Sequence, residues 1–155
     1  MKKWIESQEE MAEILGRAAV GRLGLIADGE PYIVPLNFAY ADGRIYFHSG
    51  LQGRKIEAIQ KSPRACFEVD EIQDLIVDQQ QSCLSGTRYH SVIAWGIVRR
   101  LESEPEKMKV LDCLLKKYAA GKTYQLPPQN MLAIVNVYEM QVDKMSAKAN
   151  VPDVE

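Results

Sequence analysis

The segment HSGLQGRK, residues 48–55, combines residue types that can bind a phosphate group. Its two cations, Arg54 and Lys55, fall in the first turn of a predicted helix, where the helix dipole favours anions and disfavours positive charge. Free backbone N–H groups at a helix start, the Ser49 hydroxyl and two cations can converge on one phosphate. The motif is short, and a solvated helix start with two exposed cations is the alternative.

Two neighbouring positions are candidates for contact with the rest of a ligand. His48 is either a ligand contact or a histidine of the core. Pro35 lies inside the strand-like run IVPLNFAY and interrupts a ladder of hydrogen bonds, because proline has no backbone N–H. A strand that stops pairing at Pro35 either offers its backbone to a flat ligand or lies at the edge of a sheet.

The segment RYHSVIAWG, residues 88–96, holds two further candidates. Ser91 is a short polar residue in an apolar strand, and its hydroxyl either contacts a ligand or lies at a strand end. Trp95 either stacks on an aromatic ring or packs in a core or a dimer interface. Neither residue type decides between these roles by itself.

The sequence lacks the motifs of self-sufficient catalytic sites. It contains no Ser–His–acid constellation with usable spacing, no carboxylate pair suited to acid–base catalysis, and no Walker-type or GxGxxG loop. The three cysteines form no CxxC pair, and two histidines are too few for a histidine-rich metal site. We therefore predict no metal site and expect a cofactor to carry any reaction.

Length and composition are those of one ordinary globular domain, residues 1–155. Hydrophobic residues make up 46% and charged residues 26% of the chain, which is average for a soluble protein. A net charge of −2 with mixed signs argues against a general nucleic-acid binder. No apolar stretch approaches the ~20 residues that span a membrane, and the start MKKWIESQEEM has no signal-peptide core. We expect a reduced, cytoplasmic protein.

Strands predominate in the predicted secondary structure that must position these residues. Six strands are expected, at residues 20–27, 31–40, 44–49, 64–70, 89–103 and 131–145. Capping boxes at Ser7 and Ser103, each followed by apolar residues at helical spacing, predict two helices. A third helix covers residues 53–61, and Pro63 ends it. The connection 71–88 is polar and poorly patterned.

Hairpin turns join the first three strands, so neighbouring strands are expected to be antiparallel. The turns are DGE after Ala27 and ADG after Tyr40. A parallel doubly wound sheet would need a helix between nearly every pair of strands. The predicted fold is therefore mostly β with flanking helices, a six-stranded antiparallel sheet whose strands are long enough to close into a barrel. Gly96 marks a bulge or a close approach within the fifth strand.

Four segments, in the expected order, resemble the split-barrel flavoproteins related to pyridoxamine 5′-phosphate oxidase, and within them the nitroimidazole-resistance branch. They are AVGRLGLIADGEPYIVPLNFAYADGRIYFHS, GRKIEAIQKSPRACFEVDE, CLSGTRYHSVIAWGIVRRL and the terminal VDKMSAKA. Each piece alone is weakly specific, whereas the set spans nearly the whole chain. The resemblance implies an FMN-binding split barrel.

The resemblance also implies a homodimer with two flavins at the subunit interface. The flavin would be FMN, and these residues do not exclude the larger FAD. The implied activity is oxidoreduction, in which electrons from NAD(P)H or another donor pass through the flavin to a small molecule such as a nitroimidazole or another nitroaromatic compound. A non-catalytic flavin- or haem-binding protein and a dimeric barrel with a vestigial pocket are the alternatives.

The residues that would hold the flavin follow from the same resemblance. They are Val34, Pro35, Leu36, Asn37, Phe47, His48, Ser49, Arg54, Lys55 and Ser91. Residues 34–37 would line the isoalloxazine ring with their backbone, and residues 47–49 would contact the ribityl chain and phosphate. Arg54 and Lys55 would clamp the phosphate, which explains two cations at a helix start. Ser91 would reach the flavin of the partner chain.

His48 is the candidate catalytic residue. The resemblance places it near the substrate side of the flavin, and histidine titrates near neutral pH. It would either donate a proton to a reduced nitro group or only hydrogen-bond the cofactor.

The chain also departs from the family pattern in two places. The oxidase proper has a C-terminal segment with arginine and tryptophan residues that hold pyridoxal phosphate, and MSAKANVPDVE offers nothing equivalent. Oxidation of vitamin B6 is therefore not expected. The branch often has Gly before its final Lys, where this chain has Ala147 before Lys148, which puts the terminal turn in question.

Overall fold

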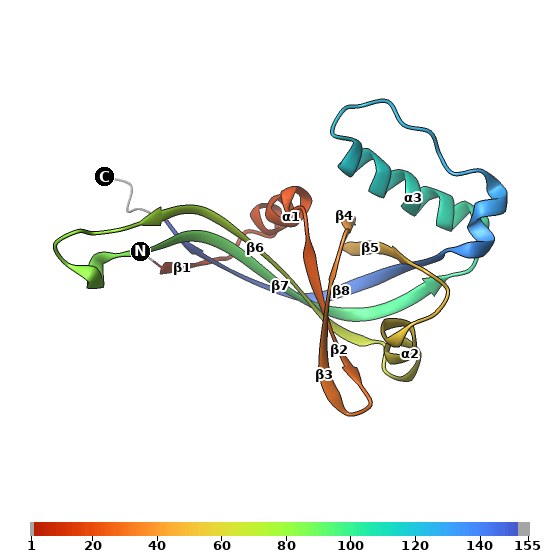
Figure 1. Ribbon diagram of the computed structural model, residues 1–155, viewed down its shortest axis with the longest axis horizontal. Coiled ribbons are helices and arrows are strands. Elements are labelled where there is room, and N and C mark those ends of the chain that lie inside the picture. The colour runs from red at the N-terminus through yellow and green to blue at the C-terminus, as the bar shows by residue number, and fades with distance from the viewer. Residues whose placement is uncertain (1, 152–155) are drawn as a thin grey trace.

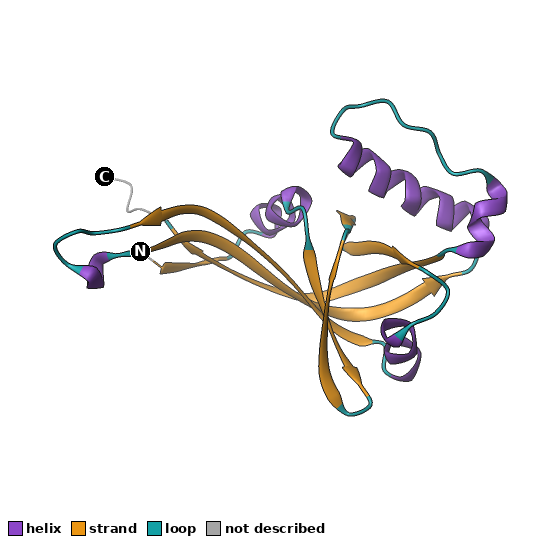
Figure 2. Ribbon diagram, viewed as in Figure 1, coloured by secondary structure: helices purple, strands orange, loops and turns teal. Residues whose placement is uncertain are grey.

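Strands dominate the computed structural model, which describes residues 2–151 (Figures 1 and 2). The strands are β1 (Lys2–Ile5), β2 (Gly21–Ala27), β3 (Glu30–Leu36), β4 (Ala39–Ala41), β5 (Arg44–Ser49), β6 (Arg64–Ile76), β7 (Gly86–Leu101) and β8 (Asn136–Asn150). The α-helices are α1 (Gln8–Arg17), α2 (Arg54–Lys61) and α3 (Glu104–Ala119), and two short 3₁₀ segments are η1 (Ser82–Leu84) and η2 (Gln129–Ile134). The helices lie around the sheet (Figure 2).

All of these strands belong to one antiparallel sheet. Its order is β3–β2–β6–β7–β8–β5–β4, and β1 pairs with the end of β8. Within the described residues the two outer strands, β3 and β4, do not pair with each other, so the sheet stays open. The predicted fold class, a mostly β antiparallel split barrel with flanking helices, is confirmed. The sheet has eight strands rather than the predicted six.

Both predicted hairpin turns are present, and each depends on residues that tolerate a left-handed backbone. Asp28 and Gly29 have φ values of 55° and 81°, and Asp42 and Gly43 have values of 51° and 72°. Two consecutive residues with positive φ make the tight turn whose twist matches that of the flanking strands. The pairs β2–β3 and β4–β5 follow directly from these turns.

The prediction of one strand over residues 31–40 is wrong, because the chain divides there into β3 and β4 at opposite ends of the sheet. Asn37 and Phe38 form the break. The Phe38 ring is fully buried and packs edge-on against Phe67 at a centroid distance of 4.8 Å. Burial of this ring draws the backbone away from β2. Pro35 lies in β3 opposite Arg22, on the edge of the sheet.

The strands β6 and β7 form a longer ribbon than predicted. They pair from Arg64–Ile97 to Ile76–Gly86, so the connection spans residues 77–85 rather than 71–88. The outer part of the ribbon extends beyond the rest of the sheet (Figure 1), where many of its side chains are exposed. A strand exposed on both faces lacks the apolar alternation that identifies strands in a sequence.

Two further strands have other boundaries than predicted, and one strand was not predicted. The last strand, β8, covers 136–150 rather than 131–145, because residues 131–134 belong to η2. The strand predicted over 89–103 ends at Leu101. The short β1 was not predicted, and it pairs along 147–150 of β8.

The three predicted helices are confirmed, two of them with their caps. The Ser7 hydroxyl accepts a hydrogen bond from the backbone N–H of Glu10 at 3.2 Å. The Ser103 hydroxyl accepts one from the N–H of Glu106 at 3.4 Å, and the same hydroxyl donates to the Glu106 carboxylate at 2.7 Å. The third predicted helix, α2, begins at Arg54, one residue later than predicted, and Gly53 is its N-cap.

Two hydrophobic clusters hold these layers together. The larger one joins α1 and α2 to the inner face of the sheet and includes Leu15, Leu23 and Phe67. The smaller one joins α3 to the region of β4, β5 and β8 through Leu111 and Leu114. Helix α3 therefore stands at one end of the molecule, above the strand that carries His48 (Figure 1).

Gly96 marks a close approach between strands, as predicted. A Cβ atom added to it would lie 2.0 Å from the backbone oxygen of Gln141. The register of β7 on β8 shifts between Trp95 and Gly96. The bulge and the close approach therefore coincide at one residue that has no side chain.

Candidate functional site

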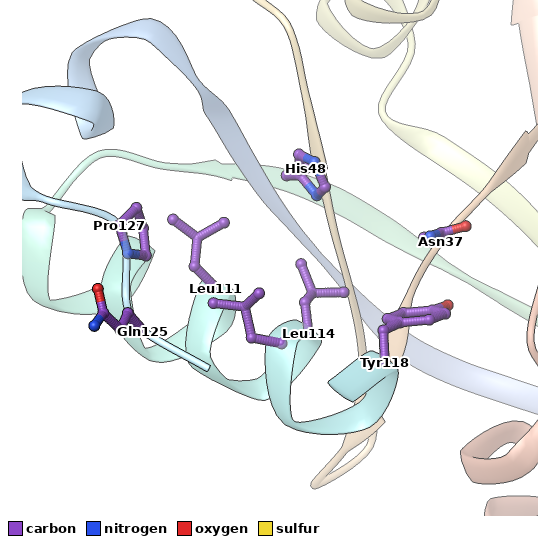
Figure 3. Close-up of a pocket in the computed structure, with 8 residues that line it drawn as sticks. Asn37, His48, Leu111, Leu114, Tyr118, Gln125 and Pro127 are labelled. Carbon is purple, nitrogen blue, oxygen red and sulfur yellow. The ribbon is translucent and has the colours of Figure 1, made fainter. Parts of the chain in front are cut away.

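Asn37 and His48 face a pocket of about 370 Å³ beneath α3 (Figure 3). Its lining consists of Asn37, His48, Leu111, Leu114, Leu115, Tyr118, Gln125 and Pro127. Asn37 comes from the break between β3 and β4, and His48 from the end of β5. The other six residues come from α3 and the segment after it.

The Tyr118 hydroxyl holds the backbone of the strand break in place. It accepts a hydrogen bond from the N–H of Phe38 at 2.8 Å. It also lies 2.8 Å from the backbone oxygen of Ala19 and 3.1 Å from that of Phe38. A phenol has one proton, so it donates to one of these oxygens at a time. Tyr118 thereby ties α3 to the residue that follows Asn37.

Lys117 strengthens the same junction. Its Nζ donates to the backbone oxygen of Ala18 at 2.7 Å and lies 3.7 Å from the centroid of the Phe38 ring. Burial lowers the pKa of Lys117 to about 8. Burial disfavours the charged form of Lys117, whereas the hydrogen bond and the aromatic ring favour it.

His48 is neutral at pH 7 in this setting. Its pKa is lowered, first by desolvation among the residues around it and second by the positive charge of Lys55. Its ring nonetheless remains open to the pocket (Figure 3). A neutral imidazole offers one nitrogen that donates and one that accepts a hydrogen bond.

The start of α2 is built to receive a negative charge. Gly53 precedes the helix with a φ of 134°, and no side chain among the described residues caps it. The N–H groups of Ile56 and Glu57 both donate to the Gly53 oxygen. The backbone N–H groups of Arg54 and Lys55 are the first two of the helix, so no carbonyl oxygen of the helix lies in position to accept from them. These two N–H groups thus lie with two cationic side chains at the positive end of a helix.

The two cations differ in their surroundings. The Arg54 guanidinium lies over the Tyr32 ring, 4.9 Å from its centroid. Lys55 is half-buried, and desolvation lowers the pKa of its amine. Its charge also lowers the pKa of His48, which shows that α2 and the pocket lie within electrostatic reach of each other.

A buried amide fixes the loop between His48 and α2. Asn136 is 5% exposed, and its side-chain N–H donates to the backbone oxygen of Gly50 at 3.1 Å. Ser49 pairs with the same residue in the sheet. The end of β5 therefore enters the loop in a defined position, with the half-exposed Ser49 as its last residue.

The side chains of the other predicted flavin-binding residues differ in how far they are buried. Phe47 is fully buried and stacks on Tyr138 at a centroid distance of 5.1 Å, so only its backbone is placed to contact a ligand. Leu36 is also buried, whereas Pro35 is exposed on the edge strand. Val34 is partly buried against the core. Of residues 34–36, only Pro35 is therefore exposed.

Ser91 is the one predicted residue that the fold keeps far from the pocket. His48 and Leu101 both pair with Val137, on opposite sides of β8. Ser91 lies ten residues along β7 from Leu101, which is about 30 Å at the usual rise of a strand. A serine side chain cannot span that length, so a single chain does not bring Ser91 to its own pocket.

The α3 side of the pocket was not predicted as part of a site. Leu111, Leu115 and Tyr118 fall on one face of the predicted helix, which is the usual pattern of a helix packed on a core. Nothing in that spacing distinguishes packing from lining a pocket. Gln125 and Pro127 lie in an irregular segment, where the sequence carries no periodic signal.

An exposed apolar face lies on β3, β2, β6 and β7. We define it by Ile26, Ile33, Cys66 and Trp95, which border one shallow depression of about 400 Å³. Ile33 is 68% exposed and Ile26 is 48% exposed. An apolar patch of this kind on a folded protein is typical of an interaction surface.

The described residues offer neither a cluster of metal ligands nor a membrane-spanning helix. No group of three or more histidine, cysteine, aspartate or glutamate side chains there lies close enough to hold a metal ion. In that same part of the chain, no helix is long and apolar enough to cross a membrane.

The family model described as pyridoxamine 5′-phosphate oxidase matches residues 7–149. This chain belongs to that family. The match covers nearly the whole chain and confirms the resemblance found in the sequence.

Solved structures extend the likeness. A candidate 5-nitroimidazole antibiotic resistance protein from Bacteroides thetaiotaomicron is 29% identical, with a TM-score of 0.85 over 96% of this chain and 87% of the other. A FAD-binding protein from Mesorhizobium loti is 24% identical, with a TM-score of 0.72 over 97% and 99%. A FAD and haem binding protein from Mycobacterium smegmatis is 21% identical, with a TM-score of 0.86 over 99% and 77%. For the last two structures, which are less than 25% identical, the likeness shows a shared fold.

Proposed function

We propose that this protein is a flavin-dependent oxidoreductase that binds FMN and reduces small nitroimidazole or nitroaromatic compounds. One observation carries the proposal: two cations and two free backbone N–H groups meet at the uncapped start of α2, next to the pocket that contains Asn37 and His48. Family membership and the similarity to the candidate nitroimidazole resistance protein support it.

The residues present fit a flavin mononucleotide. A terminal phosphate would take the backbone N–H groups of α2 and the charges of Arg54 and Lys55, and the Ser49 hydroxyl would add a bond. Asn136 holds the loop that connects these groups. One cluster of this kind suits one phosphate, which is the reason for proposing FMN rather than FAD.

The ring system would lie against backbone rather than against side chains. Residues 34–37 belong to an edge strand and to the break that follows it, so part of their backbone has no partner in the sheet. Tyr118 keeps this backbone in place through Phe38. When bound, the flavin would accept electrons from NAD(P)H or another donor and pass them to an acceptor. The chain would orient the ring and exclude water from it.

His48 is proposed as the proton donor to the acceptor. Its ring opens to the pocket. Since desolvation and Lys55 lower its pKa, a phosphate that neutralises Lys55 would raise that pKa again. Loading of the cofactor would thus bring His48 closer to the range in which it can deliver a proton near neutral pH.

A homodimer is part of the proposal. Ser91 lies too far from the pocket of its own chain, and a second chain would bring it to the flavin. The exposed apolar face of Ile26, Ile33, Cys66 and Trp95 offers a surface for that second chain. A two-fold axis would then make both sites equivalent.

A cytoplasmic location also belongs to the proposal. Cys66, Cys83 and Cys113 are all free thiols. Free thiols are typical of a reducing compartment.

The proposal is tested by the absorption spectrum of the purified protein, with mass analysis of the chromophore released on denaturation. We expect the spectrum of an oxidised flavin, the mass of FMN, and consumption of NAD(P)H in the presence of a nitroimidazole. A protein that stays colourless after incubation with FMN contradicts the proposal.

A haem-binding role is the second candidate, and one observation favours it. His48 presents a neutral imidazole to the pocket, and a neutral imidazole can ligate haem iron. A Soret band after addition of haem, lost in His48→Gln, would favour this role over reduction.

A further inference from the structure

The wall of the pocket that faces β5 is apolar and comes from α3. Leu111 and Leu114 point from the helix toward the strand that carries His48 (Figure 3). Leu115 and Pro127 complete this wall. The leucines follow each other at helical spacing, so the wall is as rigid as the helix that carries it.

The lining of this pocket carries no permanent charge. Among the described residues, those that line it include no aspartate, glutamate, lysine or arginine. Its polar members are Asn37, His48, Tyr118 and Gln125. Tyr118 already exchanges hydrogen bonds with the backbone of Phe38, which leaves the other three to meet a ligand.

None of the four lysines of α3 lines the pocket, and two of them, Lys107 and Lys117, have hydrogen-bond partners elsewhere. The amine of Lys117 is bound to the oxygen of Ala18, on the α1 side of the helix. The amine of Lys107 donates to the backbone oxygens of Leu132 and Val135 at 3.2 and 3.4 Å. Neither cation is therefore available to an anion in the pocket.

Lys55 is the cation whose charge, after desolvation, lowers the pKa of His48. Under the proposed function its charge is used by the cofactor phosphate. An anionic ligand in the pocket would then lose its hydration without gaining an ionic partner, and burial of an unpaired charge is strongly unfavourable. The free-energy cost of moving a neutral ligand from water into the pocket would be much smaller.

We propose that this pocket is the acceptor site and that it selects uncharged compounds with one or two flat rings. The apolar body would lie on the α3 wall, and a neutral polar substituent would face Asn37 and His48. A volume of about 370 Å³ is near the lower end for ligand sites, which limits the size of the acceptor. This inference rests on the proposed function and adds the charge and size of the substrate to it.

The test compares two compounds of nearly the same shape, 4-nitrobenzamide and 4-nitrobenzoate. Binding of each to the flavin-loaded protein is measured by isothermal titration calorimetry at pH 7.5. We expect the neutral amide to bind at least tenfold more tightly than the anion. Equal affinities, or tighter binding of the anion, would overturn the inference.

A charge placed in the wall should change this preference. Leu115 is half-buried and is not part of the hydrophobic clusters of the core, so it tolerates substitution better than Leu114 does. Leu115→Arg should reduce the preference for the amide at least fivefold. Met131→Arg adds the same charge at an exposed apolar residue outside the lining, and it should leave the preference unchanged.

A second substitution covers the case in which Leu115→Arg fails to fold. Leu115→Gln removes apolar surface without adding charge, so it should weaken binding of both compounds and keep the preference for the amide. Unchanged binding of the amide in this variant, or an unchanged preference in a folded Leu115→Arg, would overturn the inference.

Failure of the proposed function gives a different result. A protein that binds no flavin contradicts that function, and the same pair of titrations on the flavin-free protein then tests the pocket alone. If Leu115→Arg abolishes flavin binding and Met131→Arg does not, the α3 wall holds the cofactor itself, and the acceptor site is wrong.

Discussion

The two sides of the candidate site differ in how they are built. The α2 side is polar and local. It takes His48 and Ser49 from the end of β5 and Arg54 and Lys55 from the first turn of α2, all within eight consecutive residues. The α3 side is apolar and distant in sequence, and it reaches β5 only through tertiary packing. A local arrangement leaves a motif in the sequence, whereas a wall assembled by packing leaves only the pattern of an ordinary amphipathic helix.

The two sides also suit two different parts of a ligand. The α2 side offers positive charge and free N–H groups, which suit recognition of a phosphate. The α3 side offers aliphatic surface, which suits an uncharged ring. His48 lies where the two sides meet, since the charge of Lys55 acts on a ring that opens into the pocket. Substitutions on either side should therefore produce distinguishable defects.

Substitution of His48, at the meeting point, should have the largest effect on turnover. His48→Gln keeps a hydrogen-bonding group and removes proton transfer. We expect normal flavin content and reduction of a nitroimidazole slowed by about 10²-fold, measured by NAD(P)H consumption at saturating flavin. A colourless variant would instead place His48 among the cofactor-binding residues, and unchanged turnover would eliminate it as the acid.

The pH dependence of the flavin-free protein should sharpen this result. Since desolvation and Lys55 lower the pKa of His48, protonation is less favourable in the folded than in the unfolded chain. The stability that the neutral His48 contributes to the folded chain is therefore lost as the pH falls through the pKa that His48 has in that chain. Lys55→Met should raise the pKa of His48 in an NMR titration, and an unchanged value would contradict the coupling between the two sides.

Substitution on the apolar face should prevent the second chain from completing the site. Ile33→Glu places a charge on a residue that is 68% exposed in the single chain. We expect the dissociation constant of the dimer, measured by light scattering across a concentration series, to rise at least tenfold because a buried unpaired carboxylate is strongly unfavourable. Val77→Glu, at an exposed residue outside that face, is the control and should have no effect. A wild-type protein that is monomeric at micromolar concentration would contradict the dimer.

Removal of one hydroxyl should loosen the α3 side more modestly. Tyr118→Phe deprives the Phe38 N–H of its partner, and the free energy of unfolding in urea should fall by about 1–2 kcal/mol. Tyr124→Phe removes an exposed hydrogen bond to Asp112 and should change that free energy by less than about 0.5 kcal/mol. Equal effects of the two substitutions would show that Tyr118 does not secure the strand break.

Local features of the fold could be predicted, and features set by distant packing could not. The turns at Asp28 and Asp42, and the caps at Ser7 and Ser103, depend on neighbouring residues and are present as predicted. The division of the strand at Asn37 depends on the fit of Phe38 against Phe67 and on a hydroxyl from α3. Sequence patterns carry no sign of contacts between residues 80 positions apart.

The candidate site follows the same rule. Arg54 and Lys55 could be proposed as phosphate-binding residues from their spacing and from the resemblance, and the structure places them at one helix start beside the pocket. The resemblance also assigned Ser91 to a partner chain, and this assignment stays a prediction. Leu115 and Pro127 could not be proposed, because nothing short of the packed structure brings them opposite His48.

The measurement that tests the central claim most directly compares FMN with riboflavin, which has the same ring system but no phosphate. Dissociation constants are measured by fluorescence quenching for the wild type, for Arg54→Ala/Lys55→Ala, and for the control Lys61→Ala in the last turn of the same helix. Each charge-assisted contact is worth about 1.5–3 kcal/mol, so the wild type and the control should bind FMN at least tenfold more tightly than riboflavin. The double variant should lose most of this preference, because only the backbone N–H groups and Ser49 remain to bind the phosphate. A double variant that keeps the wild-type preference for FMN would show that the phosphate is bound elsewhere, and would contradict the account.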